Sequence, residues 1–455
     1  MKKDNSIYRK ALQLAVPMMI QSGITNAVGL VDNLMVGRLG TESMTAVSIA
    51  GQLIFVFNLA VFGALSGPGI YGAQYYGQGN DEGVKNVFRL KWWLSMIITL
   101  CGMAVLFFFS SNLLSLYLSG EGGDIDPALT LSLGQQYLNI MLIGLIPFSI
   151  TQIYAGSLRE TGESVKPMVA GVCSVIADVV FNYLLIYGKF GFPELGVRGA
   201  AVATVIARFV EMSVIVVWAH REKIKHTFLM GVYRTFLVPM AMAKPIVIKG
   251  LPIFLNEFLW AGGMAALTQC LSTRGLAVAG TNISNAICNL LNVVFIAMGN
   301  AVGIITGQML GASKYDEAKN GSLKLMRFTG ALCIGLSVLL ILLSGWFPTL
   351  YDTTDEVRRY GATFIRITAC FFPVQGYLNA LYFTLRSGGK TFITFLFDSI
   401  YTWVVPVTIA YTLCVFTALP IFTIFIVIQS CDIIKVVIGY VLIRKGIWIT
   451  NLVVE

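Results

Sequence analysis

The chain has 455 residues, of which 56% are hydrophobic and only 12% are charged. Charged residues make up roughly 25% of a soluble globular domain, so this composition excludes a soluble protein and indicates a chain that lies mostly in a lipid bilayer. The formal net charge of +9 does not indicate nucleic-acid binding, because the basic residues are spread over short loops and form no aromatic-rich basic face.

Twelve apolar segments follow one another along the chain, and each is long enough to cross about 30 Å of hydrocarbon, which takes about 20 helical residues. They lie near residues 10–36, 45–71, 91–112, 133–157, 167–187, 197–218, 245–271, 278–307, 325–347, 360–385, 392–416 and 420–443. The sequence therefore predicts an all-α integral membrane protein with twelve transmembrane helices.

The two halves of the chain are weak copies of one unit. Matched pairs of residues occur in the same order in both halves: Pro17 and Pro252, Gly69 and Gly303, Gln74 and Gln308, and Gly77 and Gly311. Internal duplication of this kind is typical of transporters built from two lobes around a central cleft. We predict two pseudo-symmetric six-helix lobes, residues 1–219 and 245–455, joined by a cytoplasmic amphipathic linker at residues 220–244.

The distribution of Lys and Arg predicts the orientation. Basic residues are concentrated at the amino end, in alternate loops and after the last span, and such loops face the cytoplasm. Both termini are therefore predicted to be cytoplasmic in a multi-pass protein of the cell (inner or plasma) membrane. Within the linker, residues 225–237 mix basic and large apolar side chains, which predicts an interfacial helix that tethers the halves.

Asp32 lies near the outer end of the first span. An ionisable residue inside a span is costly and marks a functional site by default. The alternative is that Asp32 merely caps the span at the outer interface beside Arg38. The sequence leaves both interpretations open.

A polar set in the fifth span points the same way. Asp178 and Asn182 are four residues apart, hence on one helix face, and Asn58 and Thr204 lie near them if one lobe folds as a bundle. Burial and mutual repulsion would let Asp32 and Asp178 share a proton. The same oxygen atoms suit Na⁺, so the coupling ion stays open between H⁺ and Na⁺.

The second half carries a different set of embedded polar residues. Glu257 is the carboxylate of the seventh span, and Asp398 lies in the eleventh. Asn282, Asn285 and Asn289 share one face of the eighth span. Such a stripe serves helix packing as often as ligand contact, so these residues are candidates for substrate binding or secondary coupling.

Other embedded charges have local partners in the sequence. Arg208 and Glu211, and likewise Asp432 and Lys435, are three residues apart, so each pair is predicted to bridge along its own helix. Arg366 has no local partner, and its role stays open.

Five motifs occur in the same order as in a known family. They are DNLMVGRLG at residues 32–40, AVSIA at 46–50, AQYYG at 73–77, LRETG at 158–162 and LGVRGAAVAT at 195–204. With twelve spans in two repeats, the chain resembles the multidrug and toxic compound extrusion (MATE) transporters over nearly its whole length. The resemblance implies efflux by alternating access of two lobes, driven by inward movement of Na⁺ or H⁺.

Carried over by position, Asp32 resembles the acid of the family's first helix, Asp178 with Asn182 its fifth-helix polar pair, and Thr204 its sixth-helix hydroxyl. Gln375 stands where some members have an acid in the tenth helix, so a cation site like theirs in the second lobe is not expected. Gln375 is a further candidate for substrate binding or secondary coupling. The amino-terminal lobe is thus the predicted coupling site.

These observations predict a monomeric antiporter that exports cationic or amphipathic organic compounds and contacts small organic substrates and lipids, without a cofactor or nucleic acid. The alternative is a lipid-linked precursor flippase of the same superfamily, which would need several Arg or Lys side chains in its cavity to hold a pyrophosphate. A membrane enzyme would need a nucleophile with its base or a metal cluster. Two histidines in the linker supply neither, so no enzyme is predicted.

Overall fold

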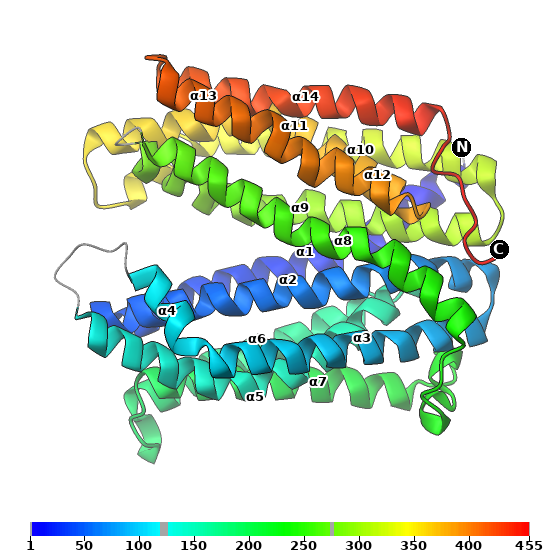
Figure 1. Ribbon diagram of the computed structural model, residues 1–455, viewed down its shortest axis with the longest axis horizontal. Coiled ribbons are helices and arrows are strands. Elements are labelled where there is room, and N and C mark those ends of the chain that lie inside the picture. Colours follow the sequence, from blue (N-terminus) through cyan, green and yellow to red (C-terminus); the bar gives the residue numbers. More distant parts are fainter. Residues whose placement is uncertain (1, 119–125, 274–276, 455) are drawn as a thin grey trace. The chain divides into compact units, whose positions relative to one another are not determined.

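The computed structural model describes residues 2–118, 126–273 and 277–454, and within them the chain is helical without a strand (Figure 1). The elements of the first half are α1 (Lys2–Gly37), α2 (Thr41–Gln78), α3 (Asp81–Phe108), α4 (Ser110–Leu118), α5 (Pro127–Glu160), α6 (Val165–Tyr187), η1 (Lys189–Gly191), α7 (Val197–Arg221), η2 (Thr227–Leu229) and η3 (Val232–Arg234). Those of the second half are α8 (Met240–Ser272), α9 (Ala277–Gly311), α10 (Tyr315–Leu343), η4 (Phe347–Leu350), α11 (Asp355–Ser387), α12 (Thr391–Phe395), η5 (Leu396–Ile400), η6 (Trp403–Val407), α13 (Thr408–Phe416) and α14 (Ile421–Arg444).

Eleven helical stretches of the described residues are long and apolar enough to cross a membrane. They correspond in order to eleven of the twelve predicted spans. The tenth predicted span, residues 360–385, lies in α11, which is 33 residues long but less apolar because Arg366, Gln375 and Asn379 interrupt it. The chain is an all-α multi-pass membrane protein.

Contacts divide the chain into two compact units. The N-unit comprises Ile20–Gly72 and Asp81–Lys244, and the C-unit comprises Met1–Met19, Ala73–Asn80 and Pro245–Glu455. Helices α1 and α2 therefore contribute residues to both units. The predicted lobe limits at residues 219 and 245 stay a prediction.

The N-unit has one apolar core to which α1 to α7 all contribute. Its α6–α7 hairpin is tight, because a Cβ on Gly199 would meet the backbone carbonyl of Leu185. This close approach brings the polar residues of α6 and α7 onto facing helices.

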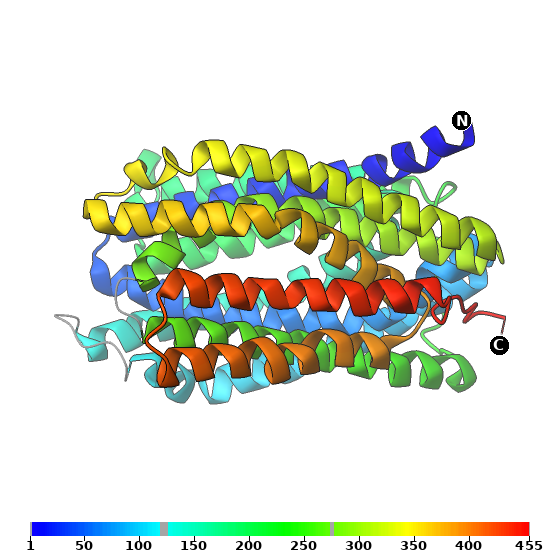
Figure 2. The same ribbon diagram turned by 90° about the horizontal axis from the view of Figure 1, so that it is seen from above.

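The C-unit packs α11 between α9, α10 and α14, and α14 is the red helix of Figure 2. Its core also includes Ile7, Ala11 and Leu14 from the start of α1. Here two repeat-related pairs meet. A Cβ on Gly77 would collide with the backbone of Gln308, and a Cβ on Gly311 would collide with the backbone of Gln74. The glycines matched by the repeat thus permit a reciprocal close crossing of the ends of α2 and α9.

The linker differs from its prediction. Residues 225–237 form no amphipathic helix but two short 3₁₀ turns, η2 and η3, separated by Gly231 with a φ of +69°. The apolar side chains of the turns pack into the N-unit, where Phe228 lies 5.9 Å from Phe88 between ring centroids and Arg89 donates to the carbonyl of Val232 at 3.0 Å. A left-handed glycine ends a helix, and burying three apolar side chains favours docking over a membrane-surface tether.

Candidate functional site

The carboxylates predicted in the first half come together in the N-unit. Asp32 lies near the carboxyl end of α1, and Asp178 and Asn182 lie on α6 one turn apart. Asn182 Nδ2 donates to Asp32 Oδ1 at 2.9 Å, and the Asp178 side chain lies beside that of Asp32. Two carboxylates from different helices therefore share one polar cluster, as the sequence predicted.

Two further residues complete this cluster. Thr204 on α7 lies beside Asp178 while its hydroxyl donates to the carbonyl of Ala200 at 3.1 Å. Tyr137 of α5 is 8% exposed and lies beside Thr204, near both carboxylates. Sequence reasoning missed Tyr137, because an aromatic residue in an apolar span gives the same signal as any core residue.

The cluster has more hydrogen-bond acceptors than donors. Asp178 Oδ1 and Asn182 Oδ1 are buried, and neither has a hydrogen-bond partner within the described ranges. Arg208 of α7 acts on Asp178 electrostatically, but its Nη1 donates to the carbonyl of Gly144 at 3.2 Å. Unpaired buried acceptors are expensive, so this cluster suits a ligand that brings positive charge.

The donor set fits either a proton or a small hard cation. Carboxylate, amide and hydroxyl oxygens are the ligands that Na⁺ accepts, and adjacent buried carboxylates favour a shared proton. Across residues 2–118, 126–273 and 277–454, no group of three or more His, Cys, Asp or Glu side chains could hold a metal ion. A Na⁺ ion here would rely on the two carboxylates, Asn182 and Thr204.

Asn58 of α2, also predicted for this cluster, is half-buried. Its Oδ1 is buried and has no hydrogen-bond partner among the residues that the structure describes. Asn58 is therefore a polar residue of the same unit with an unpaired side-chain oxygen.

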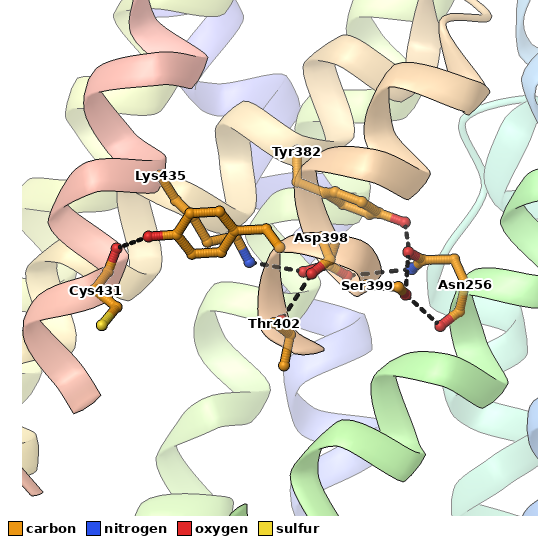
Figure 3. A network of polar contacts seen from close by, with 8 residues as sticks. Asn256, Tyr382, Asp398, Ser399, Thr402, Cys431 and Lys435 are labelled. Carbon is orange, nitrogen blue, oxygen red and sulfur yellow. Dashed lines mark hydrogen bonds and ion pairs between the residues drawn. The ribbon is translucent and has the colours of Figure 1, made fainter. Parts of the chain in front are cut away.

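The C-unit contains a second polar cluster around Asp398 (Figure 3). Lys435 Nζ of α14 lies 2.9 Å from Asp398 Oδ1, and Asn256 Nδ2 of α8 donates to Asp398 Oδ2 at 3.1 Å. The same Asn256 nitrogen lies 3.2 Å from the hydroxyl of Tyr382 on α11. Two helices, α14 and α8, therefore supply donors to this carboxylate, and Tyr382 of α11 accepts from the second donor.

Lys435 corrects one prediction. Its spacing of three residues from Asp432 predicted a bridge along α14, but it donates to Asp398, while Asp432 acts on it electrostatically. Spacing along one helix identifies residues that could pair. It does not show whether helix packing brings a partner from another helix into contact.

Glu257 of α8 is half-buried beside the same cluster. Arg386 of α11 and Asp398 are the charged groups that act on it. Arg386 is 6% exposed and lies over the ring of Phe383, 5.3 Å from its centroid. Glu257 and Asp398 therefore belong to one electrostatic environment.

The remaining predicted residues lie outside both clusters. Asn282, Asn285 and Asn289 are exposed on one face of α9, and Asn289 Oδ1 accepts from Asn292 at 3.4 Å. Gln375 of α11 is half-buried. Their proposed part in substrate binding stays a prediction.

The two embedded arginines have partners within their own units. Arg208 lies over Phe148, with 5.0 Å from guanidinium carbon to ring centroid, and acts on Glu211 electrostatically. Arg366 donates from Nε to the hydroxyl of Ser344 at 3.0 Å. Each is engaged within its own unit.

Comparison with known sequences gives a consistent result. A family model described as MatE matches residues 17–184 and 252–412. A probable multidrug resistance protein NorM of Thermotoga maritima is 26% identical over 419 residues, which is 90% of this chain and 86% of that protein. A probable multidrug resistance protein YoeA of Bacillus subtilis is 24% identical over 92% of this chain and 90% of that protein.

Solved structures share the fold. One described as the outward-facing conformation of a multidrug resistance MATE family transporter of the MOP superfamily has a TM-score of 0.85 at 21% identity, over 96% of this chain and 95% of that one. Another, described as MATE in complex with MaL6, has a TM-score of 0.84 at 21% identity over 96% of both chains. The predicted fold class, an all-α membrane protein of twelve spans in two lobes, is confirmed.

Proposed function

The chain belongs to the MatE family of the MOP superfamily and is a membrane transporter, and from that premise we propose that it is a secondary active antiporter. It exports small organic compounds, cationic or amphipathic, in exchange for Na⁺ or H⁺. Similarity to two probable multidrug resistance proteins supports efflux of foreign compounds. The family assignment also excludes an enzyme, as the sequence predicted.

The proposed coupling step rests on the polar cluster of the N-unit, which has more hydrogen-bond acceptors than donors. Asp32 and Asp178 come from different helices, and Asp32 accepts a hydrogen bond from the neutral amide of Asn182. An incoming cation or proton would neutralise two adjacent carboxylates at once. Because Asp32 is on α1 and Asp178 on α6, neutralisation changes the force between these two helices.

We place this change in an alternating-access cycle. The outward-open state takes up the cation at Asp32 and Asp178, α1 then shifts or bends, and substrate is displaced outward. The lobes rock to the inward-open state and release the cation to the cytoplasm, where both termini lie. Substrate and cation shift the equilibrium only by their different affinities for the two states.

The flippase alternative is disfavoured by the arginines. A pyrophosphate needs several Arg or Lys side chains that converge on it, but Arg208 donates to a backbone carbonyl and lies over Phe148. Arg366 is bonded to Ser344. Both guanidinium groups already have partners within their own units.

The test is transport in proteoliposomes. Purified protein of defined orientation is given an imposed Na⁺ gradient, an imposed pH gradient, or both, and the movement of a fluorescent organic cation is followed. Asp32→Asn keeps the shape of the side chain and removes its charge, so gradient-driven transport should fall at least about tenfold, as expected for loss of a coupling group worth about 1.4 kcal/mol or more.

The matched control is Asp81→Asn, which removes an exposed carboxylate from the first turn of α3. It should transport like the parent. Undiminished gradient-driven transport by Asp32→Asn, in protein that is folded and correctly inserted, would refute the assignment of the coupling site.

A further inference from the structure

Asp398 sits in an irregular stretch of its span that the coupling step does not use. The stretch between Thr391 and Phe416 contains two π-helical turns, η5 and η6, and Pro406 in the second lacks the N–H that an α-helical bond needs. Such turns are frequent at functional sites. Asp398 lies in the first, at 19% side-chain exposure.

Both oxygens of this carboxylate already have donors. The ammonium of Lys435 lies 2.9 Å from Oδ1, and the amide of Asn256 lies 3.1 Å from Oδ2 (Figure 3). In the N-unit, by contrast, Asp178 Oδ1 is buried without a partner in the described chain. The C-unit cluster therefore has a positive charge of its own, whereas the N-unit cluster leaves an acceptor unpaired.

Aromatic rings hold the ammonium in place. Lys435 Nζ lies 5.6 Å from the ring centroids of Phe397 and of Tyr401, and its side chain is 7% exposed. The Tyr401 hydroxyl donates to the carbonyl of Cys431 at 2.8 Å, one turn before Lys435 on α14. Rings around a cation stabilise it when water is excluded.

Asn256, the second donor to Asp398, is also held in one orientation. Ser399 Oγ donates to Asn256 Oδ1 at 2.6 Å, and because that oxygen is engaged, the nitrogen of the amide turns toward Asp398. Thr402 Oγ1 donates to the backbone carbonyl of Asp398 at 2.7 Å. The carboxylate is thus held in one orientation by neighbours on its own span and on α8.

Three further charged groups act on the site. Asp432 lies one turn before Lys435 on α14, while Glu257 and Arg386 come from α8 and α11. Three carboxylates therefore face two fixed cations. Without Lys435, Arg386 alone would oppose three negative charges.

We infer that Lys435 is a tethered counter-ion that occupies the carboxylate site of the C-unit, so that this unit takes up no cation and coupling is confined to the N-unit. The inference rests on the proposed function in one respect, namely that the excluded cation is the coupling ion. Lys435 determines how many cations the chain binds and does not itself contact the cation.

Removal of the ammonium should open the site. In Lys435→Gln, Asp398 would face Asp432 and Glu257 with no ammonium at hand, and a buried unpaired carboxylate must gain either a proton or a cation. A site for one further monovalent cation or proton should then appear at Asp398.

The experiment counts bound cations on the full chain in detergent. Equilibrium dialysis with radioactive sodium ion, at constant ionic strength set with choline chloride, measures Na⁺, and an indicator dye measures proton uptake in a pH titration. The parent and Lys435→Gln are compared with and without Asp32→Asn. Asp32→Asn should lose the one bound cation, and Asp32→Asn with Lys435→Gln should regain one.

Two further variants test whether the regained cation site is at Asp398. Adding Asp398→Asn to Lys435→Gln should abolish the regained site, and Lys445→Gln, which removes an exposed lysine just after α14, should bind cations as the parent does. Folded Asp32→Asn with Lys435→Gln that binds neither Na⁺ nor an additional proton overturns the inference.

If Lys435→Gln alone does not fold, the double variant Lys435→Gln with Asp398→Asn, which removes both charges of the ion pair, tests the inference. It should bind cations as the parent does through Asp32, whereas loss of binding would make Asp398 itself a coupling residue and overturn the inference. Failure of the proposed function has a different signature, since cation binding by the parent would then survive Asp32→Asn whatever stands at position 435.

Discussion

The buried carboxylates of the two units have different hydrogen-bond and charge partners. In the N-unit, Asp32 and Asp178 lie side by side, and Asn182 donates to one oxygen of Asp32 at 2.9 Å. In the C-unit, Asp398 has a donor on each oxygen, and one of these donors is the ammonium of Lys435. One cluster is short of positive charge, and the other carries its own.

This difference separates a site that can switch from one that is fixed. A cluster short of donors changes its charge when a proton or cation arrives, and so can bias two conformations. A carboxylate already paired with a covalently attached cation has one stable state. The repeat that gives the two halves a common scaffold therefore does not require them to share a coupling site.

The largest effect on stability is expected from Lys435→Met in the C-unit. Breaking a buried ion pair from one side leaves the other charge uncompensated, so the free energy of unfolding should fall by about 3 kcal/mol. Thermal unfolding in detergent, followed by intrinsic fluorescence at neutral pH and low Na⁺, measures the change. Lys445→Met should be nearly neutral, and a Lys435→Met protein as stable as the parent would contradict the pairing.

A change of opposite sign is expected from Asp178→Asn in the N-unit. The substitution keeps the size of the side chain, removes a negative charge beside Asp32 and adds an N–H donor near unpaired acceptors. The free energy of unfolding should rise by about 1 kcal/mol, while gradient-driven transport is lost. The same unfolding assay measures the first effect, and destabilisation comparable to that of Lys435→Met would remove the contrast between the units.

The sequence was sufficient for Asp32, Asp178 and Asn182 because their signals are local. Asp178 and Asn182 share a helix face at a spacing of four, and Asp32 is an acid within a span, so burial alone marks each of them. Tyr137 was missed because nothing in its neighbourhood distinguishes a tyrosine of the core from one beside carboxylates. Only the packing of α5 against α7 places it beside Thr204.

The C-unit cluster could not be predicted in the same way. Asp398 was found as an embedded acid, but its partners come from α8 and α14, which only the packing of the helices brings to it. The spacing of Asp432 and Lys435 predicted a local bridge instead. Eleven of the twelve predicted spans, in contrast, follow from apolar length, which each of these segments shows independently of its neighbours.

The smallest effect concerns pH and lies outside the spans, at His226 in the linker. Burial is the main cause that lowers the pKa of His226 below its usual value, with nearby Lys225 adding to it and Glu163 and Glu222 opposing it. The unfolded chain therefore takes up a proton on this group at a higher pH than the folded chain does, so stability is lost as pH falls below about 6.5.

His226→Gln should remove part of that loss between pH 7.5 and 5.5, measured by thermal unfolding at fixed ionic strength, and should leave the stability at pH 7.5 little changed. In His226→Gln this imidazole no longer titrates. The pH dependence of stability that remains then includes the contribution of the N-unit carboxylates, which sharpens the comparison with the C-unit. Adding Asp178→Asn should change the pH dependence that remains, whereas adding Lys445→Gln should not. An unchanged pH dependence in His226→Gln would mean that the buried imidazole is protonated as readily in the folded chain as in the unfolded one.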